Sequence, residues 1–187
     1  VGGSVLNGND PKCEVAWAGY IAEFREFLPG FKPELREHIP TCNISYKRKV
    51  FAEEQFNPNY YPQEDLEFNY KLRLKGGQIF FNPSISVHHH HREQIKVFFG
   101  HQKKIGAITS RMLKILPLQG AQIARNKLLT LLAAPILPAV KFFKTLSLFY
   151  NWNQKFVFTH WKSFVIFALG LFPWIFGFIT GSFSQSE

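Results

Sequence analysis

Residues 57–77 read NPNYYPQEDLEFNYKLRLKGG, and this stretch carries two conflicting signals of secondary structure. Across residues 66–74 apolar side chains alternate with polar ones, which is the period of a half-buried strand. Acidic residues lead the same stretch, however, basic residues follow them, and the pair Gly76-Gly77 offers a C-cap, as in a helix. We therefore predict a helix that begins at Glu64 and ends before the glycine pair.

Glu64 and Asp65 are adjacent carboxylates in a chain that has only one other aspartate, Asp10. At the N-terminus of a helix the macrodipole favours the ionised form of a carboxylate. A like-charged neighbour can also raise one of the two pKa values toward neutrality. The pattern fits plain capping of the helix by acids, and it equally fits a carboxylate that acts as a general base.

The segments on either side of this stretch alternate between helical and extended patterns. Residues 15–30 place large apolar side chains at helical spacing, so we predict a helix that ends at a Pro-Gly pair. Residues 31–40 indicate a loop or a short helix between prolines, and residues 41–51 a strand that passes into a helix start. For residues 78–91 we predict a strand, a kink at the proline and a second short strand.

The chain is basic, with 22 Lys and Arg against 13 Asp and Glu in 187 residues, a formal net charge of +9. Between residues 92 and 127 eight Lys and Arg stand against a single acid. This balance favours anionic partners, such as pyrophosphates, acidic lipid headgroups or nucleic acid. Cys13 and Cys42 are isolated, so we expect free thiols. Because the chain starts at Val1 and its only methionine is Met112, we expect a fragment of a longer protein.

The composition becomes more apolar after residue 113, so we divide the chain into a globular part, 1–113, and a membrane-associated part, 114–187. Residues 127–150 contain an uncharged run that prolines interrupt, which fits an interfacial or re-entrant helix and equally fits a membrane crossing. Residues 164–183 carry no charge, which predicts a transmembrane helix, with the buried helix of a soluble protein as the alternative. The positive-inside tendency places the preceding basic segment on the cytoplasmic side.

The order of motifs in TCNISYKRKVF…NPNYYPQEDLEFNYKLRLKGGQIFFNPSISVHHH resembles the second half of the catalytic domain of family-2 glycosyltransferases. In that family a small-residue loop with Asn leads into an apolar, basic segment. An acid–aspartate pair that opens a helix, a Gly-bounded turn, a strand with Pro and a histidine then follow. The resemblance covers residues 1–106. It implies an α/β fold, the second half of a GT-A (Rossmann-like) domain followed by C-terminal membrane helices.

The resemblance implies the chemistry of an inverting transferase. In such enzymes an acceptor hydroxyl attacks the anomeric carbon of a nucleotide-sugar donor as the nucleotide diphosphate departs, and a general base accepts the hydroxyl proton. Asp65 matches the family's base, and Glu64 stands where its usual partner does. The implied acceptor is a polysaccharide, a lipid-linked sugar or a lipid, at the cytoplasmic face of the cell membrane.

The same resemblance implies a divalent cation. Relatives place a metal-binding histidine shortly after the proline of the last strand, which matches His89, with His88 as the near alternative. The ion, Mn²⁺ or Mg²⁺, would neutralise charge on the leaving diphosphate. We expect His90 and His91 to lie in a solvated loop. A metal-handling protein is disfavoured, since no further His, Cys or Met ligands occur at paired spacing.

Substrate contacts are also implied by the resemblance. Thr41, Cys42 and Asn43 match the loop that touches the donor sugar or pyrophosphate, although relatives often have Gly where Thr-Cys stands here. A small-residue strand end is the structural alternative. Gln102 and Lys103 match a segment near the acceptor and the membrane lipids, and they equally fit a solvated basic face.

The nucleotide is where the sequence departs from the family pattern. The family holds metal and nucleotide with an Asp-any-Asp motif, which this sequence lacks. We therefore expect the N-terminal half of the same enzyme to be a partner, and the 187-residue piece to be inactive alone. The alternative is a non-catalytic basic module, anchored to the membrane, that binds anionic lipid or nucleic acid. Nucleic acid is disfavoured because the aromatic–basic interleaving of RNA-binding sheets is missing.

Overall fold

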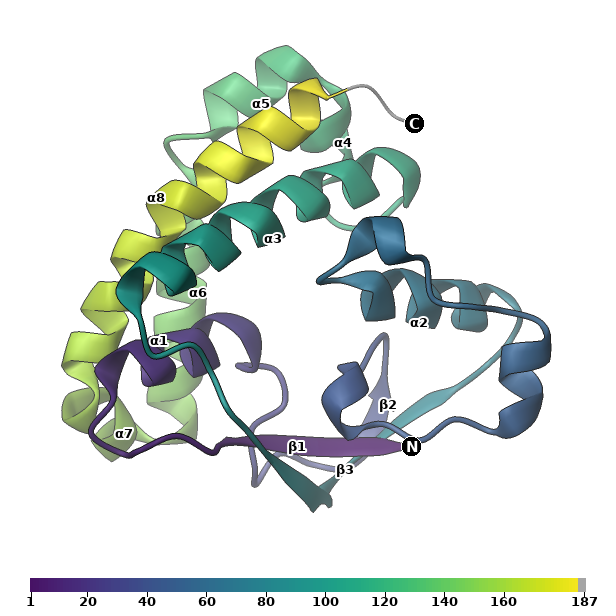
Figure 1. The fold of residues 1–187 in the computed structure, drawn as a ribbon, viewed down its shortest axis with the longest axis horizontal. Helices are drawn as coiled ribbons and strands as arrows, with labels where there is room; N and C mark the ends of the chain where they lie inside the picture. The colour runs from purple at the N-terminus through teal and green to yellow at the C-terminus, as the bar shows by residue number, and fades with distance from the viewer. Residues whose placement is uncertain (185–187) are drawn as a thin grey trace. The chain divides into compact units, whose positions relative to one another are not determined.

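The computed structural model describes residues 1–184 and has a mixed α/β fold in which helices predominate (Figure 1). These residues fall into two compact units, one of residues 1–8 with 26–90, the other of residues 9–25 with the chain from His91 onward. The first unit contains the strands β1 (Gly2–Asn7), β2 (Glu34–Arg36) and β3 (Ile79–His89), the short 3-10 turns η1 (Thr41–Asn43), η2 (Arg48–Ala52) and η3 (Pro58–Tyr60), and the helix α2 (Glu64–Leu74). The second unit contains the helices α1 (Glu14–Glu23), α3 (Ile95–Ile115), α4 (Ala121–Arg125), α5 (Lys127–Ala133), α6 (Leu137–Trp152), α7 (Gln154–Thr159) and α8 (Trp161–Phe183).

The sheet of the first unit has the strand order β1–β3–β2, with β1 parallel and β2 antiparallel to β3. The pairing of β1 with β3 slips next to Pro83, where Gly3 pairs with Asn82 but Ser4 pairs with Ser86. Proline has no N–H to donate to a ladder. A Cβ at Gly3 would overlap the carbonyl oxygen of Ile85, so only glycine fits at this irregularity. The predicted kink is thus a register shift inside one continuous strand, and the prediction of two strands is wrong.

Helix α2 confirms the helix predicted from residues 57–77. Its opposite charges pair as expected, with Lys71 Nζ 2.6 Å from Glu67 Oε1. Gly76 ends it at φ 81°, a left-handed conformation that residues with a Cβ rarely adopt. Phe68 is fully buried and stacks on Phe56, because one face of α2 closes an aromatic cluster in the first unit.

Two segments before α2 differ from the predictions. Residues 31–40 contain a strand, β2, whose pairing with β3 sets Arg36 opposite Ile79. The Arg36 guanidinium lies 4.3 Å from the centre of the Phe81 ring, so β2 is held by contacts outside its own sequence. Residues 41–51 form turns rather than a strand and a helix start, with Ile44 making a single bridge to Gly2. A three-residue strand is too short to show a period in the sequence.

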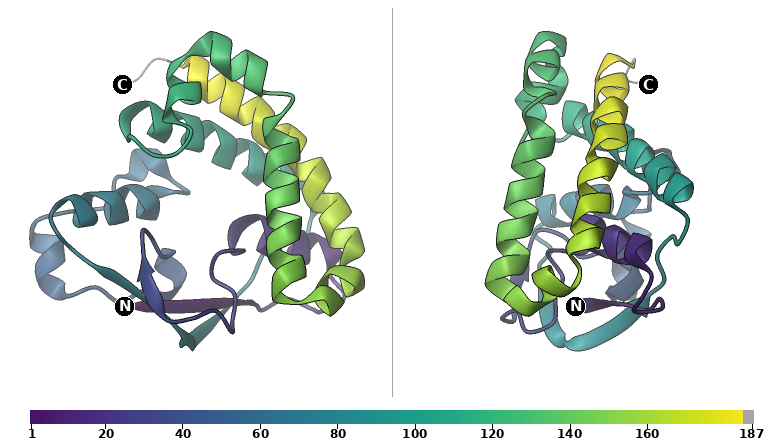
Figure 2. Two further views of the ribbon diagram at one scale, coloured as in Figure 1. Left: turned by 180° about the vertical axis from the view of Figure 1, so that it is seen from behind. Right: turned by 90° about the vertical axis from the view of Figure 1, so that its left-hand side faces the viewer.

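Helix α1 also ends earlier than predicted, at Glu23 and not at the Pro-Gly pair. It belongs to the second unit, in which α3 and α8 lie side by side (Figures 1 and 2). Helix α3 runs across residue 113, where the composition changes, so a shift in composition and the edge of a compact unit do not coincide here. The assignment of a catalytic part and a membrane part stays a prediction.

Helix α8 is 23 residues long, has a mean hydropathy of 2.0 and is long and apolar enough to cross a membrane. Less than half of its most apolar window, 44%, is buried inside the protein. Helices α5 and α6 cover the segment predicted as an interfacial or re-entrant helix, and they meet at an angle of 57°. Their bend follows from Pro135 and Pro138, which lie at and just after the break.

Candidate functional site

The first turn of α2 presents Glu64 and Asp65, as predicted. The backbone N–H of Thr41 donates a hydrogen bond to Asp65 Oδ2 at 3.1 Å, so the carboxylate is held from outside its own helix. Asp65 is half-buried. Glu64 Oε2 is also removed from solvent and makes no hydrogen bond among the described residues. Both carboxyl groups are therefore partly removed from solvent, unlike acids that cap an exposed helix.

Burial raises the pKa of Asp65, and the neighbouring charge of Glu64 raises it further, while the Thr41 N–H and His38 oppose the shift. Burial lowers the pKa of His38, so its imidazole is mainly neutral at pH 7 and compensates the Asp65 charge only weakly. His38 packs edge-on against the Phe27 ring, at 5.3 Å between centres. His38 could not be predicted as a site residue from the sequence, because a lone histidine between prolines carries no motif.

The turn η1 joins this carboxylate to the sheet. The side-chain amide of Asn43 is buried and donates to the carbonyl oxygens of Ser4, at 2.8 Å, and Ile85, at 3.2 Å. Asn43 thus anchors the turn between β1 and β3, while Thr41 and Cys42 are exposed. Of the three residues predicted to touch the donor, these two are therefore at the surface and the third is not.

His88 and His89 end strand β3, opposite Leu6 and Asn7 of β1. Successive side chains of a strand point to opposite faces, so the two imidazoles cannot both ligate one ion. Within residues 1–184 no three His, Cys, Asp or Glu side chains gather as a metal site. The Mn²⁺ or Mg²⁺ centre that the resemblance implies stays a prediction.

The last two residues of the histidine tract differ from each other. His90 is exposed, as predicted. His91 is only 5% exposed and packs in the second unit against the rings of Tyr20 and Phe24, so its assignment to a solvated loop is wrong. The tract passes from one compact unit to the other, which a uniform run of histidines cannot reveal.

Gln102 and Lys103, predicted to meet the acceptor, lie on α3 in the second unit. Gln102 is 1% exposed, and its amide lies 3.4 Å from Glu23 Oε1, to which it donates. Lys103 is exposed, with its Nζ 4.7 Å from the centre of the Phe176 ring. Of the two, Lys103 is the one available to a ligand.

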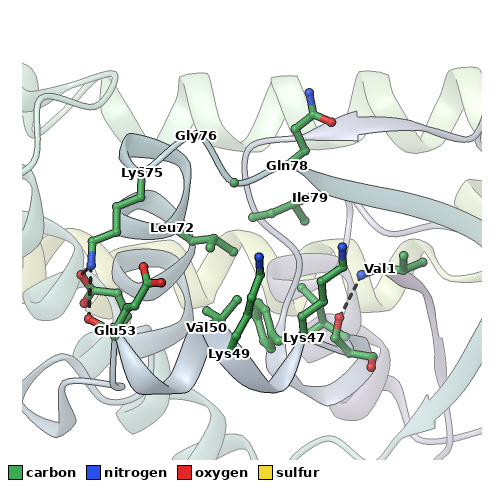
Figure 3. Close-up of a pocket in the computed structure, with 15 residues that line it drawn as sticks. Val1, Lys47, Lys49, Val50, Glu53, Leu72, Lys75, Gly76, Gln78 and Ile79 are labelled. Carbon is green, nitrogen blue, oxygen red and sulfur yellow. Dashed lines mark hydrogen bonds and ion pairs between the residues drawn. The ribbon is translucent and has the colours of Figure 1, made fainter.

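A cavity of about 730 Å³ in the first unit was not anticipated. Its lining includes Lys47, Lys49 and Lys75, but none of the predicted site residues. Lys75 Nζ lies 2.9 Å from Glu54 Oε1, whereas the side chains of Lys47 and Lys49 extend in the same direction without an ion pair to a residue drawn (Figure 3). Lys47 and Lys49 favour an anion at this cavity, while Glu53 and Glu54, which also line it, disfavour one. The basic run from Lys47 to Lys49 was the signal for it in the sequence.

The chain was compared with protein-family models, with curated proteins and with solved structures, and no match was found in any of the three.

Proposed function

We propose that this chain is the acceptor-side part of an inverting glycosyltransferase that uses a nucleotide-sugar donor. The observation that carries the proposal is the setting of Asp65, a half-buried carboxylate in the first turn of α2, held by the Thr41 N–H. Its pKa is raised by burial toward the range in which a carboxyl group exchanges protons at working pH. The ordered family-2 motifs of the sequence supply the reaction class.

In this proposal Asp65 accepts the proton of an acceptor hydroxyl while the hydroxyl oxygen bonds to the anomeric carbon of the donor. The bond from that carbon to the diphosphate oxygen breaks, and the leaving group carries its electron pair away. The Thr41 N–H binds the Oδ2 atom of the carboxylate and so fixes the orientation of the base. A mainly neutral His38 keeps the carboxylate basic, since a full positive charge there would lower its pKa.

The remaining parts of the reaction are assigned to partners. The N-terminal half of the same enzyme would hold the nucleotide, because the Asp-any-Asp motif is missing from this sequence. Membrane association suits a lipid-linked sugar, a lipid or a growing polysaccharide as acceptor, and α8 is apolar enough for it. The proposed location is the cytoplasmic face of the cell membrane.

The test compares Asp65→Asn with Asp10→Asn in the full-length protein. Asp10 is the other aspartate, is exposed and lies outside the first unit. Because an amide cannot take up the proton, Asp65→Asn should lower sugar transfer by at least about a hundredfold, the typical effect of one acid–base group. Nucleotide binding should persist, and Asp10→Asn should leave both unchanged.

Two results would remove Asp65 from this role. One is an Asp65→Asn protein that turns over within a few fold of the wild type. The other is a wild-type rate that does not rise with pH through the titration of Asp65, since a base works only when ionised. Nucleotide binding lost together with transfer would instead indicate that the variant fails to fold.

A second candidate is the non-catalytic basic module that binds anionic lipid. The cavity beside Lys47 and Lys49, together with the net charge of +9, favours it. The two candidates can be distinguished by Asp65→Asn, since lipid binding by the basic module would not depend on Asp65, whereas sugar transfer would.

A further inference from the structure

The length of α8 permits a membrane crossing, but its neighbours argue for another placement. Along its second half α8 lies directly against α3, and both helices run in the same direction. A Cβ at Gly177 would overlap the carbonyl oxygen of Lys103, and one at Gly181 would overlap Ser110. Further toward the C-terminus, Arg111 Nε donates to Ser184 Oγ at 3.3 Å. Because the two helices are in contact, α3 would have to enter the bilayer to the same depth as this part of α8.

Helix α3 is not built for a hydrocarbon environment. It carries four exposed basic residues from its first turn to its last third, Lys96, Lys103, Lys104 and Arg111, and two of them, Lys103 and Arg111, contact α8. Charged side chains in the bilayer core are costly unless they reach a headgroup, a cavity or a partner. A basic helix of this kind belongs at a membrane surface.

Two ammonium groups lie beside the middle of α8. Lys141 Nζ is 4.2 Å from the centre of the Trp174 ring, and Lys103 Nζ is 4.7 Å from that of Phe176. Both rings lie within one turn of Phe172, the central residue of α8. In a crossing helix this height is the centre of the bilayer, about 15 Å from either headgroup layer and beyond the reach of a lysine side chain.

A half-buried charged cluster lies next to the same part of α8. Glu23 Oε1 is 3.4 Å from His101 Nε2 and 3.8 Å from Arg92. Burial alone would raise the pKa of Glu23, but the hydrogen bond from His101 and the nearby positive charges outweigh it and hold the pKa below its ordinary value. Gln102, which donates to this carboxylate, packs against the position where Gly170 would carry a Cβ. The ionised carboxylate of Glu23 thus lies beside a part of α8 that would be inside the hydrocarbon core if α8 crossed the membrane.

The exposed side of α8 is mostly apolar, with Lys162 and Thr180 as exposed polar residues. Its exposed large apolar side chains recur at intervals of three or four residues up to Phe176, and Phe183 follows two turns later on the same side, so they form one stripe. The stripe consists of Trp161, Val165, Leu169, Phe172, Phe176 and Phe183, between 43% and 67% exposed. A soluble protein rarely leaves such a stripe in water.

We propose that α8 does not cross the membrane but lies in the plane of an anionic phospholipid surface, with this stripe in the lipid and α3 beside it. In that orientation every ammonium group named above lies at headgroup depth, where lipid phosphates complement its charge. Both ends of α8 then face the same aqueous compartment. The inference depends on the second unit alone and stands apart from the chemistry of Asp65.

The test uses single cysteines in a full-length protein whose other cysteines are replaced, in sealed membrane vesicles of one orientation. Thr159→Cys and Ser184→Cys mark the two ends of α8, and Ser45→Cys, an exposed position of the first unit, marks the side of that unit. An impermeant maleimide should label both ends on the same side, with yields within about twofold of each other, because the proposed helix lies flat. Labelling of the two ends from opposite sides would overturn the proposal.

Depth supplies the second measurement. Nitroxides attached at Val165→Cys, Phe172→Cys and Phe176→Cys should all report a shallow position, about 5–10 Å below the headgroups. A crossing helix would instead give a maximum at Phe172, near the bilayer centre. A protein that stays in the supernatant when membranes are sedimented would overturn the proposal as well.

Discussion

Asp65 is the residue whose surroundings matter most for the proposed chemistry. Its carboxylate is removed from water enough for burial to raise its pKa, yet it keeps one hydrogen bond from the Thr41 N–H. Burial also keeps the nearby His38 mainly neutral at pH 7, so no full positive charge offsets the carboxylate. A folded protein that holds an ionised carboxylate in this way does so at some cost to its stability.

Asp65→Asn should therefore be more stable than the wild type at pH 7, by a few degrees in Tm, the usual effect of about 1 kcal/mol in a chain of this size. The Asn side-chain oxygen can still accept the Thr41 N–H, while the buried charge is gone. Because the pKa of Asp65 is raised on folding, the wild type has its full stability below the ordinary value of 3.8 and loses it as the pH rises through the raised pKa.

The measurement is thermal unfolding of both proteins across this range of pH. The difference in Tm should shrink as the pH falls below 3.8, because Asp65 is then protonated in the unfolded protein as well as in the folded one. A variant that is less stable than the wild type at pH 7 would show that the charged form of Asp65 contributes to the fold.

At the scale of elements, the close contact between α3 and α8 is made possible by glycine. Gly106 of α3 and Gly177 of α8 both lie where a Cβ would overlap backbone atoms of the other helix. Such contacts are typical of helices that associate in or on a membrane, since small residues let two backbones approach. The placement of α8 along a basic helix depends on this contact.

Gly177→Ala should destabilise the protein by about 1–3 kcal/mol, the usual effect of overpacking a close contact. Gly100→Ala is the matched control, because Gly100 lies in α3 with nothing within 4 Å of an added Cβ. That change should stabilise the protein by about 0.5–1 kcal/mol, since alanine favours helix over glycine. Unfolding by denaturant measures both values. Equal effects of the two substitutions would contradict the packing described here.

At the scale of the whole molecule, a net charge of +9 is combined with a large exposed apolar surface on the second unit. Charge and apolar area act together at an anionic membrane, because the charge attracts the headgroups and the apolar side chains enter the lipid beneath them. Neither property alone identifies the partner.

Binding to vesicles should therefore depend both on the positive charge and on the exposed apolar surface. We expect co-sedimentation with vesicles that contain phosphatidylglycerol to exceed that with pure phosphatidylcholine at low ionic strength. Raising the salt concentration from about 0.05 M to about 0.5 M should reduce the difference in co-sedimentation between the two kinds of vesicle, since salt screens exposed charges. A difference that does not change with salt would exclude an electrostatic role for the basic residues.

Part of the candidate site could be predicted from the sequence, and part could not. Glu64 and Asp65 were placed correctly because the signals that start a helix are local. His38, the burial of His91 and the anchoring of Asn43 were missed, because each depends on a neighbour far away in the chain. The strand β2 was missed for the same reason, since its three residues are held by β3 and by the Phe81 ring.

The sequence by itself determined α2, with its charge order, its Glu67–Lys71 pair and its glycine ending, and it determined that α8 is long and apolar. These properties depend on side chains within a few positions of one another. Only the tertiary structure decided that α8 lies against the basic helix α3, and that Asp65 lies beside Thr41 and His38. The physical reason is that burial and charge depend on what surrounds a group in space, and these neighbours are brought together only by folding.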